Sequence, residues 1–314
     1  MAELFVVLVV IVGTAVAAWV HVRSSSIWYD EAVTLLTTSG HATLEWSRGL
    51  SQFKPSANLS KILLDLYHQD VHPPLYFWTL AIWRVILGES LEVARALSVL
   101  FALATLALIY RYAKSAKLRL ASIPVFVYAV SSVGVRYAYN ARPYAMVSLL
   151  VVLALLLAHR KSKWTGACSG ACVATHYFAA LCIVPVLVVA CAEQWKTNRR
   201  WSVLTAIAFG LFCAPLIVLL RVHIGARPQQ YPGFTSLYEE SCALLKGAIG
   251  GAMPHSWLPG WGLVLLLGAC LAVFGAWWAC KKREFLLPLS YGAFLCGFLF
   301  PCDSDKQVSY KNAH

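Results

Sequence analysis

Long apolar stretches without regular alternation limit what this chain can fold into. The run from Leu4 to Val20 carries no charged residue, and similar runs recur along the 314 residues, of which 60% are hydrophobic and 13% charged. A soluble domain of this length does not carry so much apolar surface. In lipid, each backbone amide must be satisfied within its own segment, which favours helices for runs without alternation. The sequence therefore predicts an all-α fold, a polytopic bundle of transmembrane helices.

Clusters of Lys and Arg between the apolar runs predict which loops face the cytoplasm, because short basic loops stay on that side of a membrane. The clusters lie at 111–119, 160–163, 196–200 and 281–283. Counting crossings between them gives about nine spans and places residues 22–92 outside as the first long loop. The same clusters account for much of the net charge of +12, so the charge does not indicate a nucleic-acid partner.

Two further segments bear on the topology. The Ala-Val-Ala at 15–17 resembles a signal-peptidase site, but Glu3 replaces the usual positive region before it, so we expect a retained membrane anchor. The segment from Leu75 to Leu87 has 13 residues and contains Arg84, which is short for a span of roughly 20 residues. It is predicted as an amphipathic interfacial helix in the first outer loop. A short true span, with the N-terminus outside, is the alternative.

The chain shows no internal repeat and no Gly/Ser linker. Residues 1–300 are therefore predicted to form a single transmembrane domain, of which 22–92 is the outer catalytic loop. Residues 301–314 form a polar tail, and its abrupt end leaves open whether the C-terminus is truncated.

Carboxylates are scarce, and half of the fourteen lie in the first outer loop. Asp30 and Glu31 follow Trp28-Tyr29 within ten residues of the end of the first apolar run, where aromatic residues belt a membrane interface. Partial desolvation there would strengthen a carboxylate as a base, so both are candidate catalytic residues. The alternative is that Asp30 caps a short helix with Glu31 in its first turn.

The sequence His72-Pro73-Pro74 predicts the start of the helix over 75–87, because proline fits the first turn. An imidazole just before a helix N-terminus suits a phosphate, since free N–H groups and the positive end of the dipole add to it. His72 is therefore a candidate phosphate ligand. A structural role is the alternative for a lone histidine beside two prolines.

Arg136 and Arg142 flank the second predicted outer turn. Cationic groups at the membrane edge could clamp a lipid-linked phosphate, and snorkelling to headgroups is the alternative. Both lie on the side where the positive-inside rule predicts few basic residues, which favours a functional role over an orientation signal. His176, in the third outer turn, is a further candidate of the same kind.

Five short motifs occur in order between residue 1 and about residue 190. They are Trp28-Tyr29-Asp30-Glu31-Ala32, His72-Pro73-Pro74-Leu75-Tyr76, Arg95-Ala96-Leu97-Ser98, Ala141-Arg142-Pro143-Tyr144 and Thr175-His176-Tyr177. In this order they resemble the bacterial protein-mannosyltransferase-like glycosyltransferases of the GT-C class, which are related to aminoarabinose transferases. The remainder of the chain resembles that family only as generic membrane spans.

The resemblance implies an inverting, multi-pass glycosyltransferase of a bacterial inner (plasma) membrane. Its active site would open to the outer face and take a polyprenyl-phosphate sugar donor, with Asp30 as the base and Glu31 orienting Asp30 or an acceptor. Together with the residue patterns above, the donor phosphate set is His72, Arg136, Arg142 and His176. Tyr76 and Tyr144, which end two of the motifs, are expected to bind substrate. The acceptor, a hydroxyl or amine of a protein, lipid or glycan, stays open.

No metal site is predicted. Many relatives carry an acidic residue two positions before Arg142, whereas this chain has Asn140, and that difference argues against a divalent cation without excluding one. The ten cysteines lie mostly inside apolar runs and none forms a CxxC pair. They indicate small core residues.

Two other function classes stay open. A lipid or sugar transporter would also have many spans, but it should carry ionisable residues at mid-span, and here they concentrate at the predicted outer turns. An inactive accessory or scaffold protein of the same fold is the second alternative, because of Asn140 and the early end of the chain.

Overall fold

Helices are the regular structure of the part of the chain that the computed structural model describes, namely residues 2–27, 29–41, 53–69, 72–131, 134–135 and 137–226. These residues belong to one structural unit, Met1–Gln230. They contain ten helices and no strand, so the all-α prediction is confirmed for this part. The predicted spans at 261–280 and 284–300 and the tail lie outside the described residues.

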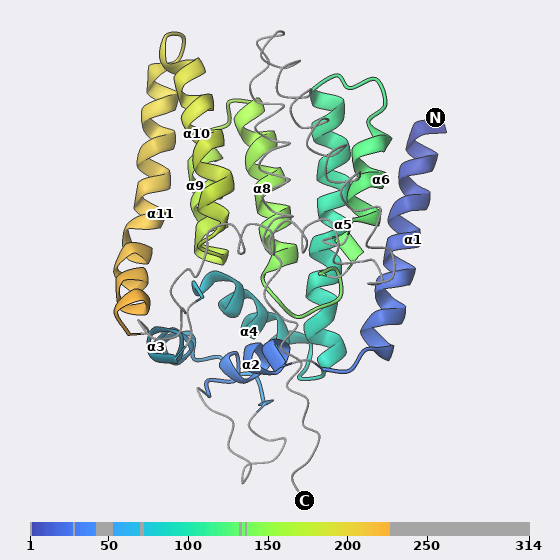
Figure 1. Cartoon of the computed structure of the whole chain (residues 1–314), viewed down its shortest axis with the longest axis vertical. Coiled ribbons are helices and arrows are strands. Elements are labelled where there is room, and N and C mark those ends of the chain that lie inside the picture. Colours follow the sequence, from blue (N-terminus) through green and yellow to red (C-terminus); the bar gives the residue numbers. More distant parts are fainter. Residues whose placement is uncertain are drawn as a thin grey trace, which may run out of the picture. The chain divides into compact units, whose positions relative to one another are not determined.

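Seven helices run side by side along the long axis of this unit (Figure 1). They are α1 (Ala2–Ser24), α5 (Leu91–Ser115), α6 (Ser122–Val130), α8 (Tyr144–His159), α9 (Thr165–Thr175), α10 (Ala179–Trp195) and α11 (Arg199–Ala226). Three of the described helices are long and apolar enough to cross a membrane: Glu3–Ser24, Leu91–Ser115 and Arg199–Arg221. The apolar helices α8 and α10 are shorter. The predicted count of about nine spans therefore stays a prediction.

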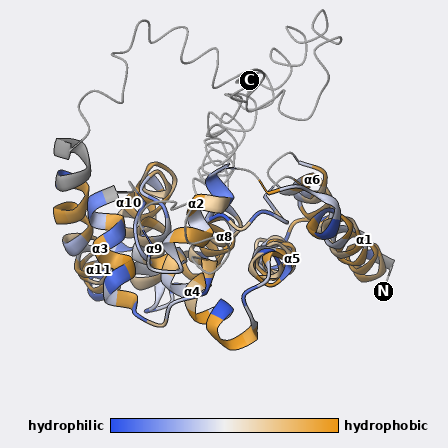
Figure 2. Cartoon of the chain, turned by 90° about the horizontal axis from the view of Figure 1, so that it is seen from below, coloured by the Kyte–Doolittle hydropathy of each residue, from blue (hydrophilic) through white to orange (hydrophobic). Residues whose placement is uncertain are grey.

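The surface of these helices is apolar, as expected for a protein that lies in lipid. On α1, large side chains such as Phe5 and Val12 are exposed, and hydrophobic residues surround the helices when the unit is seen from one end (Figure 2). In water such a surface would be an aggregation hazard. Its place in this molecule is the hydrocarbon of a bilayer.

Glycine allows α9 and α11 to approach closely. A Cβ atom on Gly166 would overlap the carbonyl oxygen of Thr205, and one on Gly170 would overlap the Cβ of Phe212. Helices in lipid gain little from hydrophobic burial, so close backbone packing at small residues is a main source of association. This contact fixes α9, whose C-terminal end carries the His176 turn.

Three shorter helices, α2 (Tyr29–Thr37), α3 (Leu59–Gln69) and α4 (Leu75–Leu87), lie at one end of the seven (Figure 1). The helix α4 begins directly after Pro74 and ends at Gly88, whose φ of 118° favours glycine. One side of α4 is buried at Tyr76 and Leu80, while Ile82 and Ile86 on another side are exposed. The predicted position of α4 along the membrane surface stays a prediction.

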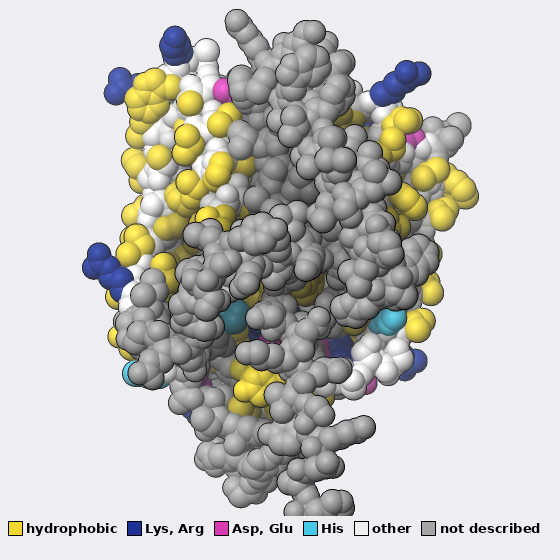
Figure 3. Space-filling view, in the orientation of Figure 1, with side chains coloured by type: hydrophobic (Ala, Val, Ile, Leu, Met, Phe, Trp, Pro, Cys, Tyr) yellow, Lys and Arg dark blue, Asp and Glu magenta, His cyan; other side chains and the backbone are white. Residues whose placement is uncertain are grey.

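The basic clusters and the predicted site motifs lie at opposite ends of the helices. The end that carries α2, α3 and α4 also holds the start of α8 and the end of α9 (Figure 1). The clusters at 111–119, 160–163 and 196–200 follow the ends of α5, α8 and α10 at the opposite end (Figure 1), although single Lys and Arg side chains are visible at both ends (Figure 3). The predicted alternation of cytoplasmic and outer loops agrees with this separation.

Candidate active site

The buried ion pair between Glu31 and Arg95 fixes the helix that carries Asp30. Arg95 Nε and Nη2 donate to the two oxygens of Glu31 at 2.8 and 2.7 Å, and the two side chains are 1% and 0% exposed. Glu31 Oε1 also accepts from the backbone N–H of Ala141 at 2.9 Å. The pair therefore joins α2, α5 and the segment that leads into α8.

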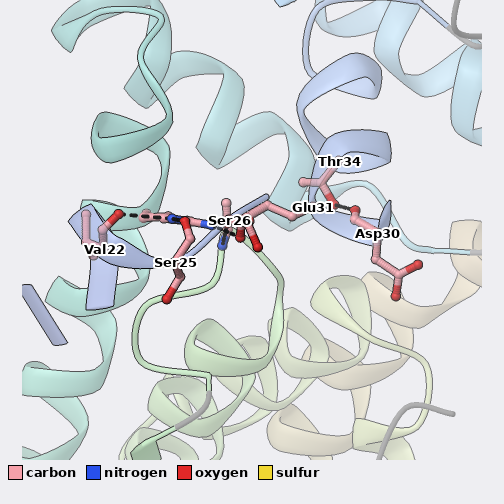
Figure 4. A network of polar contacts seen from close by, with 8 residues as sticks. Val22, Ser25, Ser26, Asp30, Glu31 and Thr34 are labelled. Carbon is pink, nitrogen blue, oxygen red and sulfur yellow. Dashed lines mark hydrogen bonds and ion pairs between the residues drawn. The ribbon is translucent and has the colours of Figure 1, made fainter. Parts of the chain in front are cut away.

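The remaining donors of Arg95 bind the end of α1. Nη1 donates to the carbonyl oxygens of Val22 and Ser25 at 2.9 Å, and Nη2 donates to that of Ser26 at 3.0 Å (Figure 4). Every N–H of the guanidinium thus has an acceptor. Because carbonyls at a helix end lack partners within the helix, the donors of Arg95 stabilise the end of α1 and the short link from α1 to α2.

A second buried arginine holds the other end of α2. Arg84 of α4 is fully buried, and its Nη1 donates to the carbonyl oxygen of Leu35 at 3.1 Å and to Thr38 Oγ1 at 2.6 Å. A cation at a helix C-terminus satisfies its last carbonyls and complements its dipole. The short helix α2 is therefore fixed at both ends, which limits the positions that the side chain of Asp30 can take.

Asp30 points away from this network. Figure 4 shows Glu31 turned toward Ser26, whereas the carboxylate of Asp30 projects from another side of α2. The side chain of Asp30 is 30% exposed, and Arg142 Nη2 lies 3.5 Å from its Oδ2. Arg142, itself 4% exposed, also donates through Nη1 to Thr34 Oγ1 at 3.0 Å. A carboxylate with solvent access beside a buried cation can receive a proton from a substrate in this position.

Aromatic rings connect Arg142 with the two histidines. Arg142 Cζ lies 5.9 Å from the ring centroid of Tyr144, whose ring is 5.7 Å from that of His176. The rings of His176 and His72 are 5.6 Å apart, and His72 precedes the start of α4. Asp30, one cation and two imidazoles thus form a continuous group from α2, the 137–143 segment, the α9–α10 turn and the start of α4.

One family model matches the part of the chain that contains most of this group. Residues 71–218 match the family model described as dolichyl-phosphate-mannose-protein mannosyltransferase. The match supports a similarity to mannosyltransferases over a little under half of the chain. It covers His72, Arg142, Tyr144 and His176 but begins after Asp30. No curated protein and no solved structure matches the chain.

The structure brings together most of the predicted site residues of this glycosyltransferase-like chain. Asp30, His72, Arg142, Tyr144 and His176 belong to one group. Arg136 lies outside the described residues. These positions agree with the predicted site, and the predicted roles stay predictions.

Two predicted site residues lie beneath this group rather than on its surface. Glu31 is fully buried in the ion pair with Arg95, so it positions Asp30 and does not face a substrate. Tyr76 is fully buried in the cluster that contains Leu80 and Leu97. Burial raises the pKa of its hydroxyl, so the hydroxyl stays protonated, and its predicted contact with substrate stays a prediction.

The sequence left the role of Arg95 unassigned, although it lies in one of the recognised motifs. A lone arginine near the start of an apolar run requires a partner, because an unpaired charge is costly at membrane depth. The many carboxylates in the first outer loop could have indicated that the partner of Arg95 lies there. The pattern did not indicate which carboxylate would be the partner.

The described residues do not fit a divalent cation. No three His, Cys, Asp or Glu side chains among them are grouped as a metal site requires. The carboxylate of Asp30 already faces Arg142, and a divalent cation needs several oxygen ligands. Whether the reaction needs a divalent cation stays a prediction, and no step below uses one.

His176 is neutral at physiological pH. Burial lowers its pKa to about 3, and repulsion from His72 and Arg142 acts in the same direction. Its Nδ1 accepts the backbone N–H of Phe178 at 3.3 Å, and this bond requires the tautomer with a proton on Nε2. His176 can therefore donate a hydrogen bond to a phosphate without carrying a charge.

This shift predicts acid sensitivity. Because the folded-state pKa lies below the ordinary value of 6.5, the unfolded chain takes up this proton first, and stability falls as the pH drops from about 6.5 toward 3. We expect the thermal unfolding midpoint in detergent to fall less between pH 7 and pH 4 for His176→Gln than for the unsubstituted protein. His159→Gln, at the opposite end, is the control. Equal pH dependence in all three proteins would contradict this role of burial.

Proposed function

We propose that this chain transfers a sugar from a polyprenyl-phosphate donor to an acceptor hydroxyl or amine, with Asp30 as the base. One observation carries the proposal. The partly exposed carboxylate of Asp30, on a fixed helix, lies beside Arg142. Arg142 contacts the ring of Tyr144, which contacts the neighbouring imidazoles of His176 and His72. The family match, whose printed name includes a dolichyl-phosphate sugar, supports a polyprenyl-phosphate donor.

The reaction that suits this arrangement is a single displacement with inversion. The acceptor oxygen or nitrogen attacks the anomeric carbon, the bond from that carbon to the phosphate oxygen breaks, and its electron pair leaves with the phosphate. Asp30 takes the proton of the acceptor and later loses it to water. One carboxylate suffices, because phosphate is a good leaving group when hydrogen-bond donors stabilise its charge. A glycoside hydrolase instead needs a second carboxylic acid.

Each residue of the site has a role in this reaction. Three side chains are placed to receive the departing phosphate. Arg142 would act as a cation and His176 as a neutral hydrogen-bond donor, and His72 would contribute a second imidazole. Tyr144 packs between them and would line the sugar site. Glu31 and Arg95 position the base without touching the substrate.

The outer face of a bacterial inner membrane is the proposed location of the site. The group around Asp30 lies at the end opposite the Lys and Arg clusters at 111–119 and 196–200, and the positive-inside rule assigns those clusters to the cytoplasm. A lipid-linked donor reaches such a site from the leaflet. The apolar face of α4 then lies along the same leaflet.

A transporter fits these observations less well. Among the described residues, the fully buried charged side chains are Glu31, Arg84 and Arg95. They lie at the end that carries α2 and pair with each other or with backbone carbonyls, whereas transport sites lie near mid-membrane. An inactive scaffold would have no need for a partly exposed carboxylate at Asp30 beside Arg142.

The test is release of the carrier. Purified protein in detergent is incubated with polyprenyl-phosphate mannose and an extract of candidate acceptors, and mass spectrometry follows the free polyprenyl phosphate. We expect release that depends on protein and acceptor. The same measurement is repeated with polyprenyl phosphates that carry other sugars. If release is equal with and without the protein for every sugar, the chain is not a transferase, and the scaffold alternative remains.

A pair of substitutions tests the phosphate group. His72→Ala and Arg142→Lys should each lower kcat/KM for the donor by roughly 10- to 50-fold, because the first removes a hydrogen-bond donor and the second loses the paired N–H donors of the guanidinium. The double variant should lose less than the product of the two, since both act on one phosphate. His68→Ala, an exposed histidine of α3, is the control. Fully multiplicative losses, or losses confined to saturation by the acceptor, would show that the two residues do not share a ligand.

A further inference from the structure

A groove lies at the end of the helices opposite Asp30. It has a volume of about 310 Å³ and is lined by Tyr110, Arg111, Lys114, Ser115 and Arg160. These residues come from the last turns of α5 and the residue that ends α8. The volume is at the lower limit of small-ligand sites, which hold roughly 300–1,000 Å³. A headgroup-sized ligand would fit, and the proposed sugar transfer does not use this groove.

Contacts between α5 and α8 give the groove a defined rim. Arg160 Nη2 donates to Ser115 Oγ at 3.3 Å, and the Nε2 of His159 lies 3.2 Å from the carbonyl oxygen of Ser115. The ring of His159 also meets that of Tyr112, with centroids 5.9 Å apart. Arg160 is thus held against α5 at the edge of this shallow groove, and Arg111 and Lys114 lie along the last turns of α5.

The charge of the groove is positive. Arg111, Lys114 and Arg160 line it, and Glu3 of α1, 3.4 Å from Lys114 Nζ, offsets one of them. The helix dipoles of α5 and α8 explain a basic residue near each C-terminus. They do not explain why three cations line one shallow groove.

We propose that this groove binds the phosphate of an anionic phospholipid headgroup. The helix Leu91–Ser115 is long and apolar enough to cross the membrane, and its last turns line the groove, so the groove lies at the level of the headgroups. Arginine matches phosphate oxygens with paired N–H donors, and Tyr110 is of the type that prefers the interface. Basic pockets between helices at this level suit anionic lipids.

The experiment measures binding of soluble short-chain phosphatidylglycerol to the purified full chain in neutral detergent. The readout is the thermal unfolding midpoint at increasing lipid. Short-chain phosphatidylcholine and inorganic phosphate are the two comparison ligands. The variants are Arg111→Gln and Arg160→Gln, and the matched controls are Lys196→Gln and Arg199→Gln, which remove exposed cations from the α10–α11 turn at the same end.

We expect a saturable rise in midpoint with phosphatidylglycerol and little change with the other two ligands. Arg111→Gln and Arg160→Gln should each weaken the apparent affinity by roughly fivefold, while the control variants keep it. Equal losses in the control variants would show a general effect of surface charge and overturn the proposal. An equal response to inorganic phosphate would overturn the assignment to a lipid.

Discussion

Asp30→Asn should lower turnover by roughly 100-fold or more while the protein still folds. Asparagine has nearly the same shape as aspartate but cannot accept the proton of the attacking group. The backbone of Asp30 keeps its place, because Glu31 and Arg84 fix both ends of α2. The measurement is the initial rate of carrier phosphate release at saturating donor, with the unfolding midpoint recorded for the same preparation.

Asp65→Asn is the matched control for this experiment. Asp65 is a partly exposed carboxylate on α3, at the same end of the molecule, but it is not in the group that contains Arg142 and the histidines. Its substitution should leave turnover within a few-fold of the unsubstituted rate. If Asp30→Asn retains nearly full turnover with an unchanged midpoint, the base is another residue. A fall that accompanies a lower midpoint would assign Asp30 a structural role.

The helices of the described unit were predictable where the sequence carries strong local signals. The apolar run from Leu4 to Val20 lies within α1, and the helix after Pro73-Pro74 begins at Leu75 and ends at Leu87 as predicted. Proline fixes a helix start locally, and Gly88 ends the helix locally. Neither requires knowledge of the rest of the fold.

The grouping of the site residues was predictable only in part. Alternation of cytoplasmic and outer loops places Asp30, Arg142 and His176 at one end, and the structure agrees. The ring contacts between Tyr144, His176 and His72 depend on how α4, α8 and α9 pack. Sequence spacing carries no information about such packing between helices, whereas the close contact of α9 with α11 through Gly166 helps to fix it.

The burial of Tyr76 illustrates what a motif leaves out. Tyr76, Leu80 and Arg84 recur every four residues and therefore share one face of α4, and the structure buries all three. The motif around His72 indicates which residues occur together, but it does not indicate which of them face the substrate. Helical spacing within the same segment could have separated His72, before the helix, from Tyr76 on its inner face.

Breaking the ion pair of Glu31 and Arg95 should have the largest effect on stability. Arg95→Met leaves a buried carboxylate and the carbonyl oxygens of α1 without their donors, and the cost should be about 3–5 kcal/mol. Glu31→Gln should be costly as well, because its amide would place N–H groups against those of Arg95 at the present distance of 2.7 Å. Both variants should show a low yield of folded protein and a reduced unfolding midpoint.

The double variant Glu31→Leu/Arg95→Met distinguishes the ion pair between the two side chains from the hydrogen bonds that each makes to the backbone. It removes both buried charges, so it should lose less stability than the sum of Arg95→Met and Glu31→Leu, measured as unfolding midpoints in the same detergent. It should not regain full stability, because the Ala141 N–H and the carbonyl oxygens of Val22 and Ser25 lose their partners. Glu3→Gln, in the partly exposed pair with Lys114, should lower the midpoint far less, because glutamine can still accept the N–H of Ser122. Strict additivity in the double variant would mean that the two side chains do not stabilise each other, and the position of Asp30 would then have to depend on Arg84 and Arg142 alone.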